Sequence, residues 1–360
     1  ISSEKINVRI VTIPVEGYDN RYPKDIICAE SGKIKYFNQT KYSLASNLFD
    51  EYKELDDSIR QNFKILFFPH VYIRSPFVNP FSRGGMPYSL HIKSFFVKMK
   101  DGSSFSIITS SNLAVRDSCK NEIMLNIKNE KKASKLNEKF FKKLINISIP
   151  LMNYDEGNDP IKFKVKFEPS PQFTEQFFTA PFYKDSNKKV HDKICELINV
   201  AKKRIYVCAQ HISAYDIFYN KKFDDSAEVD NYINQKGFLY NILDRTDLEV
   251  KFLSQTFVDE SGNSHGCRRP SNIKGFKNFI EAYNMSGHEG YFVNKDMHSK
   301  FIVIDDTLII STFNYTPTQF IYLKNVNIDE FVKIKNKSYN GIHSEVGQMI
   351  IVDDKIVAEK

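Results

Sequence analysis

Residues 297–306 read MHSKFIVIDD, and the segment STFNYT follows at positions 311–316. An imidazole and an ammonium group stand two positions apart here, at His298 and Lys300, next to a run of β-branched and aromatic residues typical of a buried strand. Side chains at positions i and i+2 of a strand point to the same face of the sheet. The pattern therefore predicts that both basic groups project into one pocket, where they would suit chemistry on a phosphate ester.

A second copy of this pattern lies in the first third of the chain. HIK at 91–93 is followed by TSSN at 109–112, and Asp101-Gly102 between them is a turn signal that predicts a hairpin. Both copies have His-x-Lys and then a hydroxyl residue two positions before an asparagine. We therefore predict an internal repeat and divide the chain into two similar halves, residues 1–165 and 166–360.

These motifs resemble the signature of the phospholipase D superfamily, H-x-K-x4-D-x6-G-S-x-N. The C-terminal copy matches it at His298, Lys300, Asp305 and Asn314, but the last interval is one residue shorter and Ser311-Thr312 stands where Gly-Ser is usual. The N-terminal copy has a lysine, Lys98, where the acid is expected, and it keeps His91, Lys93, Ser110 and Asn112. The first copy is similar to the tyrosyl-DNA phosphodiesterase branch and the second to the bacterial nuclease-type branch, so the branch stays open.

The resemblance implies an α/β fold in which two βαβ halves, related by pseudo-two-fold symmetry, pack largely parallel or mixed sheets against each other with flanking helices. Hydrophobic periodicity predicts helices at 188–203, 237–243 and 272–283 and strands at 204–209, 248–253 and 291–293. The first half carries a predicted strand at 5–11, another at 121–127 and a basic helix at 131–145. Nothing before residue 5 matches 188–209, so we expect this half to be truncated at its start.

Phosphodiester hydrolysis needs a nucleophile, a proton donor for the leaving oxygen and positive charge around the phosphoryl oxygens. Two histidines, His91 and His298, can divide the first two tasks, and the resemblance implies that His91 attacks. Lysines and neutral amides would bind the phosphate, namely Lys93, Lys300, Asn112 and Asn314. Supporting contacts are expected from Ser110, Asp305 and Thr312. Because the lysines supply the charge and no metal-ligand spacing stands out, we expect no metal and no other cofactor.

A nucleophilic imidazole keeps one nitrogen available only if the other is held by an acceptor. The candidate acceptors are Glu122 and Glu345, and the resemblance implies that Glu345 orients His91 while Glu122 orients His298. The alternative is that each glutamate merely begins a strand at the surface.

The net charge of +7 suits a polyanionic partner, and we expect nucleic acid, DNA rather than RNA. Candidate substrate-binding residues around the mouth are Arg83, Tyr88, Arg268, Arg269 and Tyr315; taken singly, each is more often a solvated charge or a packing ring. Rival functions are cleavage or transfer of phospholipid headgroups and non-catalytic nucleic-acid binding. With both motifs in one chain we expect a self-sufficient monomer. Five cysteines without framework spacing, and no membrane-length apolar run, favour an intracellular protein of the cytoplasm or nucleus.

Overall fold

The structure is a computed structural model that describes residues 6–12, 51–68, 88–112, 119–150, 168–169, 176–179, 183–184, 186–212, 238–266, 270–315 and 344–359. The chain forms two compact units. The first comprises Ile1–Leu90, Glu138–Val165 and Val326–Ile342, and the second comprises His91–Asn137, Lys166–Asn325 and His343–Lys360. Both motifs therefore fall in the second unit, and the division of the chain at residue 165 stays a prediction. Pseudo-two-fold symmetry between the two halves stays a prediction.

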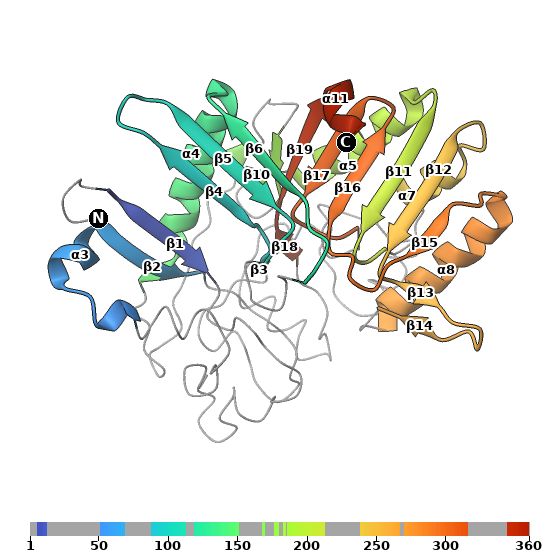
Figure 1. Cartoon of the computed structure of the whole chain (residues 1–360), viewed down its shortest axis with the longest axis horizontal. Helices are drawn as coiled ribbons and strands as arrows, with labels where there is room; N and C mark the ends of the chain where they lie inside the picture. Colours follow the sequence, from blue (N-terminus) through green and yellow to red (C-terminus); the bar gives the residue numbers. More distant parts are fainter. Residues whose placement is uncertain are drawn as a thin grey trace, which may run out of the picture. The chain divides into compact units, whose positions relative to one another are not determined.

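A seven-stranded sheet forms the centre of the second unit (Figure 1). Its strands run in the order β15 (Tyr291–Val293), β12 (Glu249–Ser254), β11 (Arg204–Ala209), β16 (Lys300–Ile304), β17 (Thr307–Ser311), β19 (Gln348–Asp353) and β9 (Gln176–Phe178). Only β15, β12 and β11 are parallel. The other neighbours are antiparallel: β16 with β11, and then β17, β19 and β9 in turn, with β16 and β17 joined by a tight hairpin at Asp305-Asp306, where Asp305 adopts a φ of 52°. The sheet is therefore mixed, which is one of the two arrangements expected from the sequence.

Three helices of this unit confirm the predicted helical segments: α5 (Ser186–Val200), α7 (Phe238–Leu243) and α8 (Pro270–Ser286). Along α5 the buried residues are Val190, Ile194 and Ile198, at the spacing of one helical face. On α8, Phe279 and Tyr283 pack against Phe252 of β12. Phe252 pairs with Val207 of β11, so this face of the sheet is the one that α8 covers.

The opposite face of the sheet is covered by other elements. Val303, Leu308 and Ile310 pack there with Ala358 of α11 (Lys355–Ala358) and with Ile123 and Leu125 at the start of β6. Burying apolar side chains on both faces stabilises strands β16 and β17 at the centre of the unit. The same packing brings β6, which follows the first motif, onto the strands that carry the second.

Strands β4 (Ser94–Lys98), β5 (Ser104–Thr109) and β6 (Met124–Lys128) form an antiparallel three-stranded sheet. The predicted hairpin at Asp101-Gly102 is confirmed. Gly102 adopts a φ of 84°, and the backbone N–H and hydroxyl of Ser103 donate to Oδ1 of Asp101 at 2.8 and 2.6 Å. A side chain that accepts from residues just beyond it closes such a turn locally.

Helix α4 (Lys131–Ile147) matches the predicted basic helix and contributes a buried amide to the second unit. Asn137 donates to Oγ of Ser106 at 2.7 Å, and its Oδ1 accepts from Gln176 at 2.8 Å and from Gln348 at 3.4 Å. All four side chains are buried. This network joins β5, α4, β9 and β19, because a buried polar group needs a hydrogen-bond partner.

The first unit contains β1 (Val8–Thr12), α3 (Asp57–Asn62), β2 (Phe63–Phe67), β3 (Tyr88–Leu90) and β7 (Ile149–Pro150). Strand β1, which confirms the strand predicted at 5–11, pairs with β2 in parallel, and β2 pairs with β7 in antiparallel. Short strands of the second unit are β8 (Glu168–Pro169), β10 (Tyr183–Lys184), β13 (Phe257–Val258), β14 (Ser264–His265) and β18 (Ser344–Val346). Within the described residues, none of the helices has the length and apolar character needed to cross a membrane.

Replacing Asn137 by alanine should lower the free energy of unfolding of the second unit by about 2–4 kcal/mol. The change leaves Gln176, Gln348 and Ser106 without their shared partner, and each buried unpaired polar group costs about 1–3 kcal/mol. Urea unfolding followed by circular dichroism measures the effect. Asn126→Ala, at an exposed position of β6, is the matched control and should stay within about 0.5 kcal/mol of the wild type. Equal losses in the two variants would contradict a stabilising role for the network.

Candidate active site

The two motif histidines lie just before strands rather than within them. Strand β4 begins at Ser94 and β16 at Lys300, so the prediction that each His-x-Lys lies wholly on a strand is wrong. Each histidine is instead fixed by the neighbourhood of the other motif. The backbone N–H of His298 donates to the carbonyl of Asn121 at 3.1 Å, and that of His91 donates to the carbonyl of Val346 at 2.9 Å.

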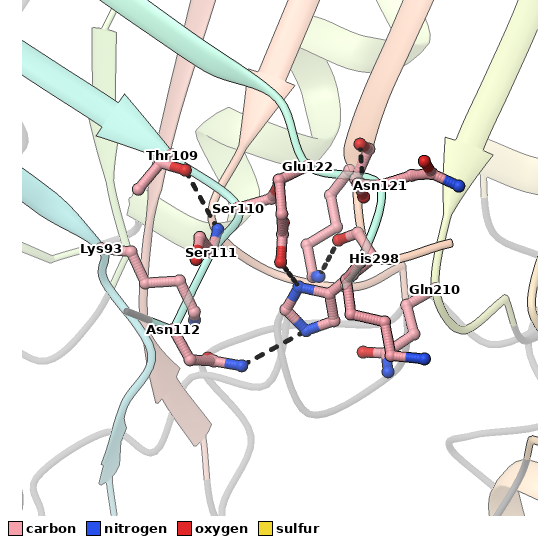
Figure 2. Close-up of polar contacts among 12 residues, drawn as sticks. Lys93, Thr109, Ser110, Ser111, Asn112, Asn121, Glu122, Gln210 and His298 are labelled. Carbon is pink, nitrogen blue, oxygen red and sulfur yellow. Dashed lines mark hydrogen bonds and ion pairs between the residues drawn. The ribbon is translucent and has the colours of Figure 1, made fainter. Parts of the chain in front are cut away.

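His298 is held by a carboxylate that follows the first motif. Its Nδ1 lies 2.6 Å from Oε1 of Glu122, and the hydroxyl of Ser110 donates to the other oxygen of that carboxylate. Ser110 is itself fixed, because its Oγ accepts from the backbone N–H of Ile123 at 3.0 Å. Figure 2 shows Glu122 and Asn112 at two different nitrogens of the ring, with the Asn112 amide 3.4 Å from Nε2. A carboxylate at Nδ1 favours a proton there, which leaves Nε2 as the reactive nitrogen.

His91 has the corresponding partner from the other motif. Its Nδ1 lies 2.9 Å from Oε2 of Glu345, a residue of β18. Both side chains are largely buried, with 23% and 15% of their surface exposed. The structure thus brings each glutamate to the histidine of the opposite motif, and neither is simply a surface residue at the start of a strand.

The two lysines of the motifs are buried in the same neighbourhood. Lys93 is 7% exposed and Lys300 is 0% exposed. Nζ of Lys93 donates to the carbonyl of His91 at 2.7 Å and lies 3.4 Å from the carbonyl of Thr312, in the other motif. Nζ of Lys300 donates to the carbonyl of His298. Buried ammonium groups need such partners, and these two carbonyls belong to the histidines of the same motifs.

The charge of the two lysines acts on both imidazoles. Burial, with smaller contributions from the charges of Lys93 and Lys300, lowers the pKa of His91 to about 4, while Glu345 opposes the shift. The pKa of His298 is also lowered, chiefly by burial, with Lys300 and Lys93 adding to the effect and Glu122 opposing it. Each histidine therefore feels the lysine of the other motif as well as its own. The two motifs form one electrostatic site, in which both imidazoles are neutral near pH 7 until an anion binds.

The second motif's hydroxyl and amide are placed differently from those of the first. Oγ1 of Thr312 accepts from the backbone N–H of Gln348 at 3.0 Å and so ties the end of β17 to β19, whereas Ser110 supports Glu122. Oδ1 of Asn314 accepts from the backbone N–H of His211 at 3.3 Å. The backbone N–H of His211 needs an acceptor, so the amide oxygen of Asn314 must face it. The NH₂ group of Asn314 then points to the other side and can donate elsewhere.

Two sequence-based assignments are corrected by the structure. Tyr315 was predicted to stack on substrate, but its ring is fully buried and packs edge-on against Phe238 at 5.7 Å, and burial raises the pKa of its hydroxyl. Asp305 and His298 lie at opposite ends of β16, because His298 precedes the strand and Asp305 follows it. Its carboxylate accepts from the backbone N–H groups of Lys202, Lys203 and Arg204 at 2.8, 2.8 and 3.1 Å. Asp305 therefore fastens the β16–β17 hairpin to the start of β11 and does not support the imidazoles.

Four further assignments concern the mouth of the site. Arg83, Arg268 and Arg269 lie outside the described residues, as does the side chain of Tyr88.

Sequence reasoning also missed Asn121, whose carbonyl accepts from the His298 N–H and from Oγ of Ser299 at 3.0 Å. The sequence did contain a signal for this contact: Ser299, the hydroxyl residue between His298 and Lys300, which donates to the Asn121 carbonyl. Across the described segments, no cluster of three or more His, Cys, Asp or Glu side chains is placed to hold a metal ion.

No protein-family model matches the chain, and no curated protein is similar to it. Similar solved structures include Nuc from Salmonella typhimurium, described as a phospholipase D family member, with 15% identity over 51% of this chain and 86% of that one and a TM-score of 0.28. Phosphatidylserine synthase from Haemophilus influenzae Rd KW20 has 18% identity over 53% of this chain and 36% of that one, with a TM-score of 0.28. Polyphosphate kinase from Porphyromonas gingivalis has 8% identity over 98% and 44%, with a TM-score of 0.42.

A phospholipase D family member is thus among the solved structures to which this chain is similar. The TM-scores lie below 0.5. What the site can do therefore follows from its own residues: two carboxylate-held imidazoles and two buried ammonium groups.

Replacing Lys93 by methionine should raise the pKa of His91 from about 4 toward the ordinary histidine value. A nearby like charge disfavours the protonated imidazole, and its removal should shift the pKa upward by about one unit. Titration of the histidine ring signals by NMR measures the shift. Lys132→Met, at an exposed position of α4, is the matched control and should leave the His91 pKa unchanged. A wild-type value near 6.5, or no response to Lys93→Met, would contradict the electrostatic account of the site.

Proposed function

We propose that the chain is a phosphodiesterase that hydrolyses nucleic acid through a phosphohistidine intermediate. The observation that supports this best is the reciprocal pairing of His91 with Glu345 and of His298 with Glu122, beside two buried lysines. Of two imidazoles with oriented protons, one can take up the phosphoryl group while the other gives and then accepts the proton.

In the first step, Nε2 of His91 attacks phosphorus. The new P–N bond forms as the P–O bond to the leaving group breaks, and His298 gives its proton to the departing oxygen. His91 is suited to attack because its low pKa keeps it neutral. His298 must be protonated, and the phosphate anion favours that state when it enters beside the ring.

In the second step, His298 accepts a proton from water as the water oxygen attacks phosphorus. The P–N bond breaks, which restores a neutral His91 and a protonated His298. The glutamates keep each ring oriented, so their contribution is positional and electrostatic.

The lysines and asparagines bind the phosphoryl oxygens in this scheme. Lys93 and Lys300 contribute the full charges, and we infer that each redirects part of its hydrogen bonding from a backbone carbonyl to phosphate. Amide donors from Asn112 and Asn314 add neutral hydrogen bonds. Because two ammonium groups offset the charge that builds up on phosphate, the proposed reaction needs no metal ion.

The choice of nucleic acid rests on charge. A net charge of +7 favours a polyanion, with DNA preferred to RNA, and Arg83, Arg268 and Arg269 are proposed to contribute at the mouth. Both motifs reside in one chain and one unit, so a monomer is proposed to suffice.

A substrate panel in the presence of EDTA tests this function. Purified protein is incubated with single-stranded DNA, duplex DNA, RNA, a 3′-tyrosyl oligonucleotide and phosphatidylcholine. We expect hydrolysis of at least one DNA substrate, and a loss of about 10³-fold in the His298→Asn variant because the proton donor is gone. His265→Asn, the same substitution at an exposed histidine of β14, should keep wild-type activity. Cleavage of phosphatidylcholine alone, or activity abolished by EDTA and restored by Mg²⁺ or Zn²⁺, would contradict the proposal.

A further inference from the structure

Four polar residues at the carboxyl ends of β11 and β12 have no part in the reaction described above: Gln210, His211, Gln255 and Thr256. We call them the β11–β12 polar cluster. In the register of β11 with β16, Ala209 pairs with Lys300, so Gln210 and His211 continue β11 alongside the segment that carries His298. Figure 2 shows Gln210 next to His298. Ligands of open α/β sheets bind beyond the carboxyl ends of parallel strands, which is where this cluster lies.

The side chains of Gln210 and Gln255 are linked by a hydrogen bond in which Gln210 is the donor. Nε2 of Gln210 donates to Oε1 of Gln255 at 3.1 Å, and Nε2 of Gln255 donates to the carbonyl of Lys295. An amide has two N–H donors and an oxygen that accepts two hydrogen bonds. Within the described part of the chain, the contact with Gln255 engages one N–H of Gln210. It fixes the orientation of the Gln210 amide while leaving it a donor and an acceptor for a ligand.

His211 and Thr256 complete the cluster and connect it to the second motif. The Thr256 hydroxyl donates to the carbonyl of Gln210 at 3.2 Å, so its oxygen accepts from Nδ1 of His211, which is 3.4 Å away. The backbone N–H of His211 donates to Oδ1 of Asn314. Thr256 is buried, whereas Gln210, His211 and Gln255 are partly exposed. The cluster is therefore preorganised, reachable by solvent and tied to an amide of the second motif.

We propose that the β11–β12 polar cluster binds the nucleoside attached to the scissile phosphate on the His298 side, with Gln210 contacting the edge of its base. This inference rests on the proposed function. A fixed amide offers a donor and an acceptor side by side, which matches the polar edge of a nucleobase. The glutamines carry no charge, so they suit a neutral polar group rather than another phosphate. The cluster would then contribute to substrate choice, and the lysines would bind any phosphodiester alike.

The test compares oligonucleotides with a diester that has no nucleoside. The ratio of kcat/KM for single-stranded homopolymer oligonucleotides of each base to kcat/KM for bis(p-nitrophenyl) phosphate is measured for the wild type, Gln210→Ala and Gln210→Glu. The glutamate keeps the shape and the acceptor of Gln210 but loses the donor, and it guards against a folding defect in the alanine variant. We expect the ratio for the preferred base to fall about tenfold in both variants, with a smaller spread among the four bases. Asn199→Ala, at the exposed end of α5, is the control and should keep the wild-type ratio.

A variant ratio equal to that of the wild type would overturn the inference, whether both activities are kept or both fall together. Failure of the proposed function gives a different result. In that case the wild type itself hydrolyses bis(p-nitrophenyl) phosphate but none of the oligonucleotides.

Discussion

A buried imidazole can act at one nitrogen only if an acceptor holds the other, and in this chain each acceptor comes from the opposite motif. Glu122, which follows the first motif, lies at Nδ1 of His298, and Glu345, which follows the second, lies near Nδ1 of His91. This constraint fixes much of the surrounding structure. The start of β6 must lie against β16, and the shared apolar packing of Ile123 and Leu125 with Val303 keeps it there. The apolar packing around β6 thus places the Glu122 carboxylate. That carboxylate in turn orients the ring of His298, which lies beside a strand of another sheet.

The second requirement is charge. Lys93 and Lys300 are buried beside the imidazoles and donate to backbone carbonyls. Burial is the main cause of the lowered pKa of both histidines, and the charge of the two lysines adds to it. In the proposed reaction, a phosphate anion would favour protonation of one ring. The same electrostatics would then attract the substrate and prepare the acid–base pair.

Much of this arrangement could be predicted from the sequence, because hydrophobic periodicity is a local property. Strand β11 matches the predicted 204–209, and α8 contains the predicted helix at 272–283. The pairing of the glutamates followed from the resemblance to a known family, since a contact over 176 residues leaves no local signal. Asp305 and Tyr315 were misassigned for the same reason. Their position near the motif in sequence does not show that one caps a distant turn and the other fills a core.

The direction of the strands shows a further limit. Alternating helices and strands predict parallel pairing, which holds for β11, β12 and β15. Strand β16 is already antiparallel to β11, so the chain reverses between β15 and β16, in the short segment that carries His298. The two-residue turn at Asp305-Asp306 then reverses it again. Short connections on either side of the motif strand thus override the topology that the longer elements suggest.

Trapping of the phosphoenzyme tests most directly whether the two histidines act in sequence on one phosphate. Wild type, His91→Asn and His298→Asn are mixed with a phosphodiester that has a good leaving group, quenched in alkaline denaturant to preserve phosphohistidine, and analysed by mass spectrometry. We predict a covalent adduct on His91, the phosphoryl group with its remaining ester substituent, that accumulates in His298→Asn and is absent from His91→Asn. A phosphoryl group on His298 of the wild type would reverse the two roles. Turnover at the wild-type rate by either single variant would contradict one site shared by both motifs.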